Sequence, residues 1–352
     1  MTVDRTLESR PEVGDLSADG LHYWDGNIWG WQPLWLAPDE VVSAARMPFE
    51  RPVTDVHFLA AGLLNQSWRL DADDGVYVLR VSRLERSREQ VAYEHAFTRE
   101  LMKRVDVVVP PLKGRNGESI QQWRGWTLSL FPFIEGVSGS AIDAEVLVQQ
   151  AAAILARIHR ASLDHVRFGR RPGFRSIDEH PRWIWFTVKP ILTRDLGGTE
   201  DFDALCRALD REIAELDRWL DGLDAARRPL SRATVHGDFN PRNLIFRDNR
   251  LVAVIDWDEC RVEPVAWEVA QVGLGSPDIA PDAFWRTYLD AGGPLVPEGV
   301  ELLGGFARMG ALSELRWTVK SGQATPHAIK QVRDVAAALA WLSERAAGLP
   351  PP

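Results

Sequence analysis

The chain has 352 residues, a formal net charge of -9 at pH 7 and two cysteines. This length allows two lobes or two domains plus an extension, and the acidic balance argues against a nucleic-acid-binding protein. Cys206 and Cys260 have no metal-binding or redox spacing, so we expect reduced thiols in a cytoplasmic protein. The N-terminus lacks the apolar core of a signal peptide, and no apolar run reaches membrane-spanning length.

The N-terminal segment is rich in tryptophan. Two apolar stretches, 21–24 and 28–31, flank Asp25-Gly26, which predicts a β-hairpin. With its pattern YWDG-x-x-W, the segment resembles a short Trp-rich module attached to assorted bacterial proteins. We expect its tryptophans to pack against one another and the main body, since aromatic clusters are more often packing than site. The alternative is that they line a partner or ligand surface. The residues concerned are Trp24, Trp29, Trp31 and Trp35.

A β-rich region with one helix follows. Alternating apolar residues between turn signals predict the strands, and apolar residues at i, i+3 and i+4 predict the helix. The predicted strands are 65–70, 76–81, 121–123 and 126–132, and the predicted helix is 87–104.

One carboxylate lies on the apolar face of the predicted helix. Glu94 shares that face with Val91, Phe97 and Leu101. A buried carboxylate needs a partner, and we expect Arg80 on the preceding strand to provide it. Glu100, on the more polar side of the helix, is the rival candidate.

The most informative stretch is 234–258, TVHGDFNPRNLIFRDNRLVAVIDWD. Short apolar runs on either side of the turn 247–250 predict a hairpin. Its loop, 236–242, and the end of its second strand bring Asp238, Asn243 and Asp256 together with no helix between them. The alternative, ordinary turn chemistry for each residue, is weakened by the ordered pair of motifs.

This set of side chains suits phosphoryl transfer. One carboxylate accepts the proton of an attacking hydroxyl, while a second carboxylate and an amide oxygen hold Mg²⁺ against nucleotide phosphates. The spacing Asp-x4-Asn with a later strand-end Asp is that of protein kinases. The loop HGD-x-x-x-x-N and the strand end I-D-W resemble the aminoglycoside phosphotransferase family, a branch of the kinase-like fold. The resemblance implies that Asp238 is catalytic and that Asn243 and Asp256 bind the metal.

The resemblance also assigns roles to the β-rich region. Gly62 and Asn65 match the G-x-x-N form of the nucleotide loop, in which backbone N–H groups lie over phosphate oxygens. Arg80 stands where protein kinases carry a lysine, and the family's ion pair between this cation and a helix glutamate corresponds to Arg80 and Glu94. Arginine keeps the charge but has a bulkier fork than lysine.

Several residues of the second half are assigned supporting roles. His159, at the end of the predicted helix 144–160, and His236 are expected to be structural rather than reactive. Glu268 stands where the family often has a structural aspartate. The stretch 167–175 is strongly basic, and a predicted helix, 201–220, belongs to a region that covers the substrate cleft in the family.

The fold class implied is α+β, a two-lobed protein-kinase-like fold with a β-rich N-lobe and a mainly helical C-lobe. The expected parts are an N-terminal extension with the Trp-rich hairpin, 1–45, a nucleotide-binding N-lobe, 46–134, and a C-lobe with catalytic loop, metal site and substrate cleft, 135–352.

The implied reaction transfers the γ-phosphoryl group of ATP or GTP, with Mg²⁺, to a hydroxyl of a small molecule. The substrate would be an aminoglycoside-like antibiotic, an amino sugar or an amino alcohol, and the acidic chain suits a cationic one. No nucleic-acid or membrane partner is expected, and the oligomeric state is left open. Two alternatives are a kinase for a peptide or protein hydroxyl in a biosynthetic pathway and a nucleotide-binding pseudokinase scaffold. The intact catalytic set argues against the scaffold, while Arg80 and the single-glycine loop keep it as an alternative.

Overall fold

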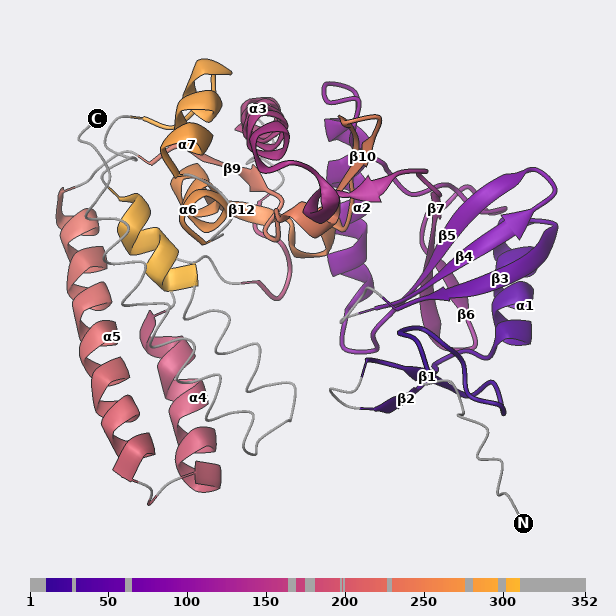
Figure 1. The fold of residues 1–352 in the computed structure, drawn as a ribbon, viewed down its shortest axis with the longest axis horizontal. Coiled ribbons are helices and arrows are strands. Elements are labelled where there is room, and N and C mark those ends of the chain that lie inside the picture. The colour runs from indigo at the N-terminus through magenta and orange to yellow at the C-terminus, as the bar shows by residue number, and fades with distance from the viewer. Residues whose placement is uncertain are drawn as a thin grey trace, which may run out of the picture. The chain divides into compact units, whose positions relative to one another are not determined.

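The computed structural model describes residues 11–26, 30–60, 65–163, 169–174, 181–196, 198, 200–226, 230–275, 281–296 and 302–310. The chain divides into two compact units, Met1–Glu135 and Gly136–Pro352 (Figure 1). The first is built on strands and the second mainly on helices, which confirms the predicted α+β, two-lobed kinase-like fold class.

The first unit is organised around a five-stranded antiparallel sheet in the order β3-β4-β5-β7-β6. The predicted strands and helix are confirmed within a few residues at their ends. The elements are β1 (His22–Trp24), β2 (Trp31–Pro33), α1 (Pro38–Phe49), β3 (Val53–Leu59), β4 (Gln66–Ala72), β5 (Gly75–Ser82), α2 (Arg88–Leu101), β6 (Gln121–Trp123) and β7 (Trp126–Pro132).

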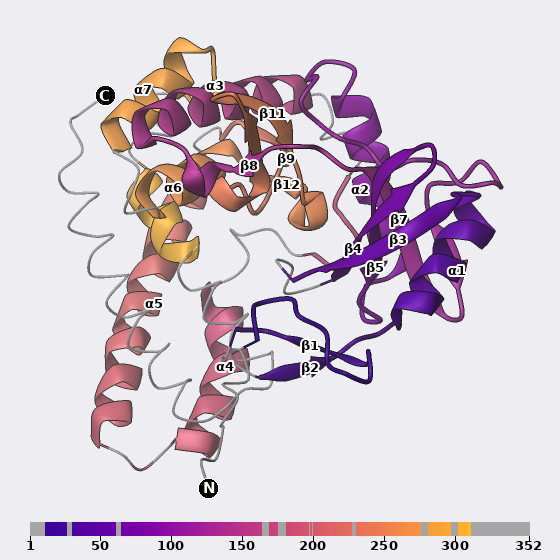
Figure 2. The ribbon, with the colours of Figure 1, turned by 45° about the vertical axis from the view of Figure 1, so that its right-hand side comes forward.

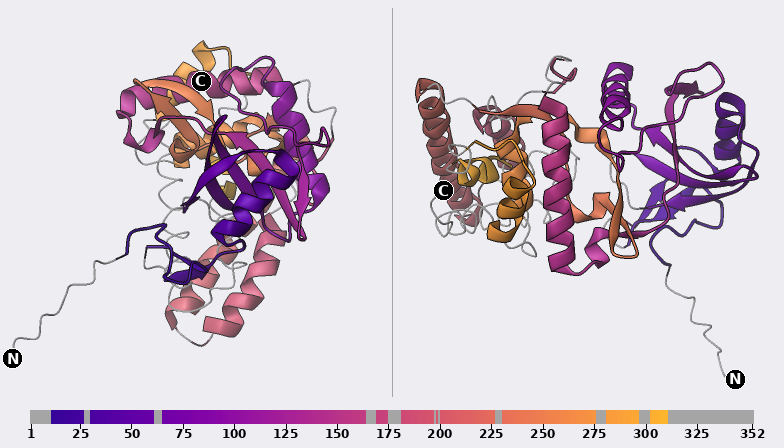
Figure 3. Two further views of the ribbon diagram at one scale, coloured as in Figure 1. Left: turned by 90° about the vertical axis from the view of Figure 1, so that its right-hand side faces the viewer. Right: turned by 90° about the horizontal axis from the view of Figure 1, so that it is seen from above.

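The sheet separates an apolar face from a polar one. Helix α1, which the sequence reading did not anticipate, buries Val41, Ala44 and Phe49 in one core with Leu79 of β5. Successive side chains on a strand point to opposite faces, so Arg80 lies on the face away from this core. Figure 3 shows α1 and α2 on opposite sides of the sheet. The strand therefore delivers its cation to the side where α2 lies.

The predicted N-terminal hairpin is confirmed, with Trp24 opposite Trp31. Asp25 closes its loop, because Asp25 Oδ1 accepts the N–H of Gly30 at 3.0 Å. Trp24 and Trp31 meet edge to face with ring centroids 5.4 Å apart, and Trp35 stacks on Trp126 at 5.2 Å. These contacts give the described tryptophans a packing role, while Trp29 lies outside the described residues.

The second unit is centred on α3, which packs along α7 and β9. Two small antiparallel sheets, β11-β10-β8 and β12-β9, lie beside it, and α4 and α5 run side by side (Figure 2). The elements are β8 (Val137–Ser138), α3 (Ala144–Ser162), α4 (Pro181–Leu196), α5 (Glu200–Ala226), β9 (Arg232–Val235), β10 (Leu244–Arg247), β11 (Arg250–Val254), β12 (Arg261–Pro264), α6 (Val265–Gly275) and α7 (Pro281–Asp290).

The predicted hairpin of the most informative stretch is formed by β10 and β11. Asp248 and Asn249 at its tip have φ values of 51° and 56°, the left-handed pair of a two-residue hairpin turn. None of the described helices combines the length and the apolar character needed to cross a membrane.

Candidate active site

The predicted catalytic loop connects β9 to β10 in the second unit. Asp238 Oδ1 accepts a hydrogen bond from Asn240 Nδ2 at 2.9 Å, and Asp238 Oδ2 accepts one from Asn243 Nδ2 at 3.0 Å. Neutral amide donors therefore hold both carboxylate oxygens in one orientation, as the alignment of an attacking hydroxyl requires. Asn240 was missed from the sequence. The sequence feature that could have identified Asn240 is its place in a loop, two residues after Asp238, because Asn side chains in loops commonly form hydrogen bonds within their own segment.

The amide of Asn243 is turned with its nitrogen toward Asp238. Asn243 Nδ2 also donates to the backbone oxygen of Asp238 at 2.8 Å. Its amide oxygen is therefore directed away from that carboxylate, and an oxygen is the atom that a hard cation takes from an asparagine.

Asp256 ends the strand that returns to this loop. The N–H of Ile255 donates to the backbone oxygen of Asn243 at 2.9 Å, which ties the end of the strand to the other predicted metal ligand. Asp256 itself has a φ of 60°, a left-handed conformation that is uncommon outside glycine and costs free energy. The fold thus brings Asp238, Asn243 and Asp256 to one end of the hairpin, as the sequence predicts.

His236 has the structural position expected of it. Its Nε2 lies 2.9 Å from the carbonyl oxygen of Ile255, and its Nδ1 accepts the N–H of Asp238 at 3.3 Å. A carbonyl can only accept, so Nε2 carries the proton. Both ring nitrogens are thus occupied by backbone groups, and the ring joins the loop to the strand end.

Gly237 is required for the close approach of the loop to the next segment. Its φ is 88°, and a Cβ atom here would collide with the backbone carbonyl of Glu259. A side chain at this position would therefore displace either the catalytic loop or the segment after the metal-side strand.

A buried glutamate holds the backbone of the predicted catalytic loop in place. Glu268, on α6, accepts the N–H groups of His236 at 3.1 Å and Gly237 at 2.5 Å. Its Oε2 also lies 2.8 Å from Nε2 of His159, whose Nδ1 lies 2.8 Å from the hydroxyl of Tyr288. Glu268 thus performs the anchoring that the resemblance assigned to it, and His159 has the structural role expected.

The surroundings of Glu268 favour its charged form. Burial alone raises the pKa of this carboxyl group, but the hydrogen bonds from His159 and from the N–H of Gly237 act in the opposite direction and outweigh burial. The pKa of Glu268 is therefore lowered from 4.5.

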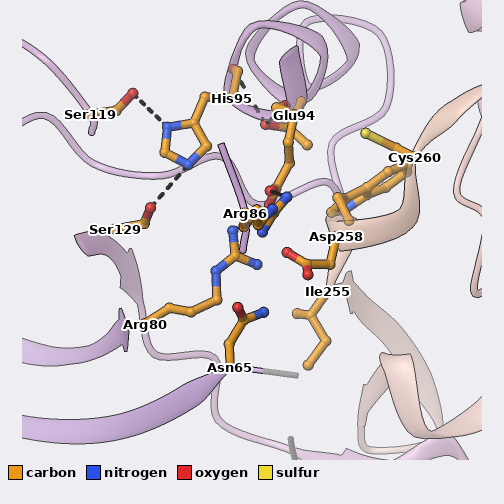
Figure 4. A network of polar contacts seen from close by, with 12 residues as sticks. Asn65, Arg80, Arg86, Glu94, His95, Ser119, Ser129, Ile255, Asp258 and Cys260 are labelled. Atoms are coloured by element: carbon orange, nitrogen blue, oxygen red, sulfur yellow. Dashed lines mark hydrogen bonds and ion pairs between the residues drawn. The ribbon is translucent and has the colours of Figure 1, made fainter. Parts of the chain in front are cut away.

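In the first unit, Arg80 and Glu94 form the predicted ion pair. Arg80 Nη2 lies 2.6 Å from Glu94 Oε1, while Glu100 pairs with Lys103 at 2.7 Å. A second guanidinium, missed from the sequence, lies on the other carboxylate oxygen: Arg86 Nη2 is 2.6 Å from Glu94 Oε2 (Figure 4). The signal for Arg86 was a basic residue directly before the capping serine of α2.

These three buried side chains carry two positive charges and one negative charge. The guanidinium of Arg80 also lies over the ring of Phe131, 4.9 Å from its centroid. Guanidinium groups bind anionic groups such as phosphates well. The side chain of Glu94 thus holds both guanidinium groups in place.

The predicted nucleotide loop is described only in part. Gly62 lies outside the described residues. Asn65 is buried at the start of β4, where its Oδ1 accepts the N–H of Arg83 at 3.3 Å. This bond joins the end of the loop to the end of β5, the strand that carries Arg80.

The donor set fits a magnesium ion shared with a nucleotide better than a metal held by protein alone. Within the described part of the chain, no group of three or more His, Cys, Asp or Glu side chains is arranged to hold a metal. Magnesium in phosphoryl-transfer sites is held by one or two protein ligands plus substrate phosphates and water. One carboxylate, Asp256, and one amide oxygen, that of Asn243, match this pattern.

Comparison with known proteins defines the class. Residues 55–312 match the model of the phosphotransferase enzyme family. The chain is 25% identical to the homoserine kinase of Xanthobacter autotrophicus over 74% of this chain and 73% of that protein. It is 25% identical to the homoserine kinase of Beijerinckia indica over 60% of this chain and 61% of that protein.

Solved structures share the fold. A spectinomycin phosphotransferase bound to ADP and spectinomycin superimposes with a TM-score of 0.66 at 15% identity, covering 89% of this chain and all of that one. A microcompartment-associated aminopropanol kinase gives a TM-score of 0.64 at 18% identity, covering 87% and 96%. The fold and site define a kinase-like phosphotransferase that acts on a hydroxyl group of a small molecule. The chain belongs to the phosphotransferase enzyme family.

Proposed function

We propose that this chain transfers the γ-phosphoryl group of ATP or GTP to a hydroxyl of a small molecule, with Asp238 as the catalytic residue. The observation that carries this proposal is the fixing of both Asp238 oxygens by Asn240 and Asn243. The transition state of phosphoryl transfer is loose, so the main task of the carboxylate is to orient the attacking hydroxyl. It accepts the hydroxyl proton as the bond to phosphorus forms.

Asn243 and Asp256 are the proposed protein ligands of Mg²⁺. A bound magnesium ion neutralises charge on the nucleotide phosphates during transfer. The contribution of the chain is to hold both oxygen donors ready, through the bonds of Asn243 to Asp238 and of Ile255 to Asn243. Asp256→Ala is expected to weaken magnesium-dependent nucleotide binding while leaving the β10–β11 hairpin intact.

In the first unit, the proposed nucleotide contacts are Arg80, oriented by Glu94, and the loop that contains Gly62 and Asn65. We assign residues 46–134 to nucleotide binding and residues 135–352 to the catalytic loop, the metal ligands and the substrate. The support for this assignment is the pair of buried guanidinium groups, those of Arg80 and Arg86, that Glu94 holds in place.

For the substrate, the relatives indicate a small hydroxyl compound. Curated relatives are named homoserine kinases, and the solved neighbours include an aminopropanol kinase and a spectinomycin phosphotransferase. A hydroxy amino acid, an amino alcohol or an antibiotic hydroxyl would each use the same machinery, because the reacting group is the same.

The test is nucleotide turnover with ATP and GTP, in the presence of Mg²⁺, against amino alcohols, hydroxy amino acids, amino sugars and aminoglycosides. Asp238→Asn is expected to lower kcat by about 10²- to 10⁴-fold, the usual contribution of a positioned acid–base group. Asp248→Asn is the matched control, because Asp248 lies at the exposed tip of the same hairpin. Equal activity of the two variants would rule out Asp238, and nucleotide binding without turnover on any substrate would favour the pseudokinase.

A further inference from the structure

Among the residues that the structure describes, one buried arginine outside the catalytic loop has no carboxylate partner. Arg171 follows α3 and is only 2% exposed. Its Nη1 donates to the backbone oxygens of Asp258 at 2.5 Å and Cys260 at 3.0 Å. Its guanidinium lies over the ring of Phe174, 4.4 Å from the centroid. One of its three nitrogens is therefore well satisfied.

The other two nitrogens of Arg171 are buried without partners. Nε and Nη2 make no hydrogen bond to any residue the structure describes. These two N–H groups point the same way along one edge of the planar guanidinium, the edge that binds a carboxylate or phosphate with two parallel hydrogen bonds. Of the described arginines with buried unsatisfied nitrogens, Arg171 alone leaves both atoms of this edge unsatisfied.

Two carboxylates of the neighbouring segment, those of Glu259 and Glu263, form ion pairs with another arginine. Arg261, whose guanidinium lies 5.8 Å from the Phe174 centroid, pairs with Glu263 at 2.9 Å and with Glu259 at 3.5 Å. A buried guanidinium group without a charged partner is unfavourable. A buried group left unsatisfied in this way calls for a ligand or an ordered water molecule.

The position of Arg171 relates it to the reaction. The two carbonyls that it binds flank Glu259, whose own carbonyl lies against Gly237 of the catalytic loop. The same segment begins two residues after Asp256. Arg171 thus binds the backbone between Asp256 and β12. This backbone lies directly beside the loop that carries Asp238.

We propose that the Nε and Nη2 edge of Arg171 receives a carboxylate of the substrate, so that the acceptor is a hydroxy carboxylate. The inference rests on the proposed kinase function and narrows its substrate to a hydroxy acid or hydroxy amino acid. A carboxylate there supplies the missing counter-charge and two charge-assisted hydrogen bonds, and it holds the substrate in one orientation beside Asp238.

The test pairs a change in the substrate with a change in the protein. L-homoserine, L-serine and 3-hydroxybutyrate are compared with their carboxamides in the turnover assay, for the wild-type chain, Arg171→Lys and Arg171→Gln. Arg170→Lys is the matched control, because Arg170 is the exposed neighbour. Lysine retains the charge that binds the two carbonyls but cannot present a two-hydrogen edge.

We expect wild-type kcat/KM to fall about 100-fold from a carboxylate to its carboxamide, the usual scale for truncating a buried charge pair. Arg171→Lys is expected to raise KM for the carboxylate by about 10- to 100-fold with kcat within a few-fold, and to leave the carboxamide unchanged. A role limited to clamping the Asp258–Cys260 segment would lower turnover of both substrates equally.

The remaining outcomes separate this inference from the proposed function. Turnover confined to compounds without a carboxylate overturns the inference and leaves the kinase standing. Calorimetry of the Asp238→Asn protein with Mg²⁺ and nucleotide supplies a second measurement, the binding of a hydroxy carboxylate. If this binding depends on Arg171 while the wild-type chain shows no turnover, the inference is supported and the proposed kinase activity is wrong. The inference is wrong if no hydroxy carboxylate binds, since water then fills the edge, or if inorganic phosphate or acetate competes equally, since the edge is then a general anion site.

Discussion

Each unit of the chain contains a buried glutamate, Glu94 or Glu268, that holds a functional segment in place, but the two carboxylates are stabilised differently. Glu94, in the first unit, is held by two guanidinium groups, those of Arg80 and Arg86. Glu268, in the second unit, is held by His159 and by two backbone N–H groups. Both residues are only 1% exposed.

The difference corresponds to what each carboxylate positions. Glu94 orients two guanidinium groups, the side-chain groups that bind phosphates with the strongest hydrogen bonds. Glu268 orients backbone, and donors of lower charge suffice to hold a loop in place. Each glutamate also has a histidine neighbour: His159 bonds directly to Glu268, whereas His95, adjacent to Glu94, bonds instead to Ser119 and Ser129.

The largest expected effect comes from removing the charge of Glu94. Glu94→Gln removes the negative charge that two buried guanidinium groups share, so we expect the free energy of unfolding of the first unit to fall by about 3–5 kcal/mol. Urea denaturation monitored by hydrogen exchange of the α2 amides measures this free energy of unfolding. Glu100→Gln, on the exposed side of the same helix, is the control and should cost at most about 0.5 kcal/mol. Equal losses in the two variants would remove the special role of Glu94.

A smaller loss is expected at Glu268. Glu268→Gln weakens the bonds to His236 and Gly237, so we expect about 2–3 kcal/mol of destabilisation together with a fall in kcat, because the catalytic loop is less well positioned. The pKa of Glu268 is lowered, so the charged carboxylate stabilises the fold above pH 4.5, and this part is lost as the pH falls through its folded-state pKa. Unfolding measured from pH 3 to 7 should show the acid-dependent part in the wild type and not in Glu268→Gln.

His95 provides a pH test confined to the first unit. Burial lowers the pKa of His95 from 6.5 to about 3, with Arg80 and Arg86 acting in the same direction and Glu94 opposing them. The unfolded chain therefore binds a proton that the folded chain does not, and stability falls as the pH drops below 6.5, approaching about 1.4 kcal/mol per pH unit. In His95→Gln this slope should disappear between pH 6.5 and 4.5. A slope unchanged in the variant would mean that His95 is protonated in the folded state.

The smallest effect concerns the loop that Glu268 anchors. Asn240→Ala removes one of the two amide donors from Asp238, and we expect kcat to fall about 10-fold, near 1.4 kcal/mol, with KM little changed. Asn240→Asp should place a second carboxylate beside Asp238, raise its pKa and move the acid limb of the pH–rate profile upward. Asn249→Ala, at the hairpin tip, is the control. A change in KM alone would show that Asn240 contacts substrate instead.

The elements that the sequence predicted are those with local signals. The strands β6 and β7 were predicted at their observed bounds, because Arg124-Gly125 between them adopts positive φ and closes the hairpin. Helix α1 was missed although Pro38 at its first position and acidic residues in its first turn are start signals. The pairing of β9 with β12 was missed because its partners, such as Val235 and Arg261, lie far apart in the chain.

The candidate site divides in the same way. Asp238, Asn243 and Asp256 were identified from their spacing, since a short hairpin must bring its loop and strand end together. Arg86 and Arg171 were not identified from the sequence. Their neighbours along the chain do not show that Arg86 pairs with Glu94, or that Arg171 binds two carbonyls of a distant segment. The partner of a long, charged side chain depends on which elements pack around it.

The sequence by itself therefore predicted the reacting set, the local elements and the family, because each prediction depends on residue types at short, ordered spacing. Only the tertiary structure decided how the charges are balanced. The burial of Glu94 and Glu268, the sharing of one carboxylate by two arginines and the unsatisfied edge of Arg171 all arise from contacts between segments distant in the chain. The free energy of a buried charge depends on such contacts, and local sequence patterns carry little information about them.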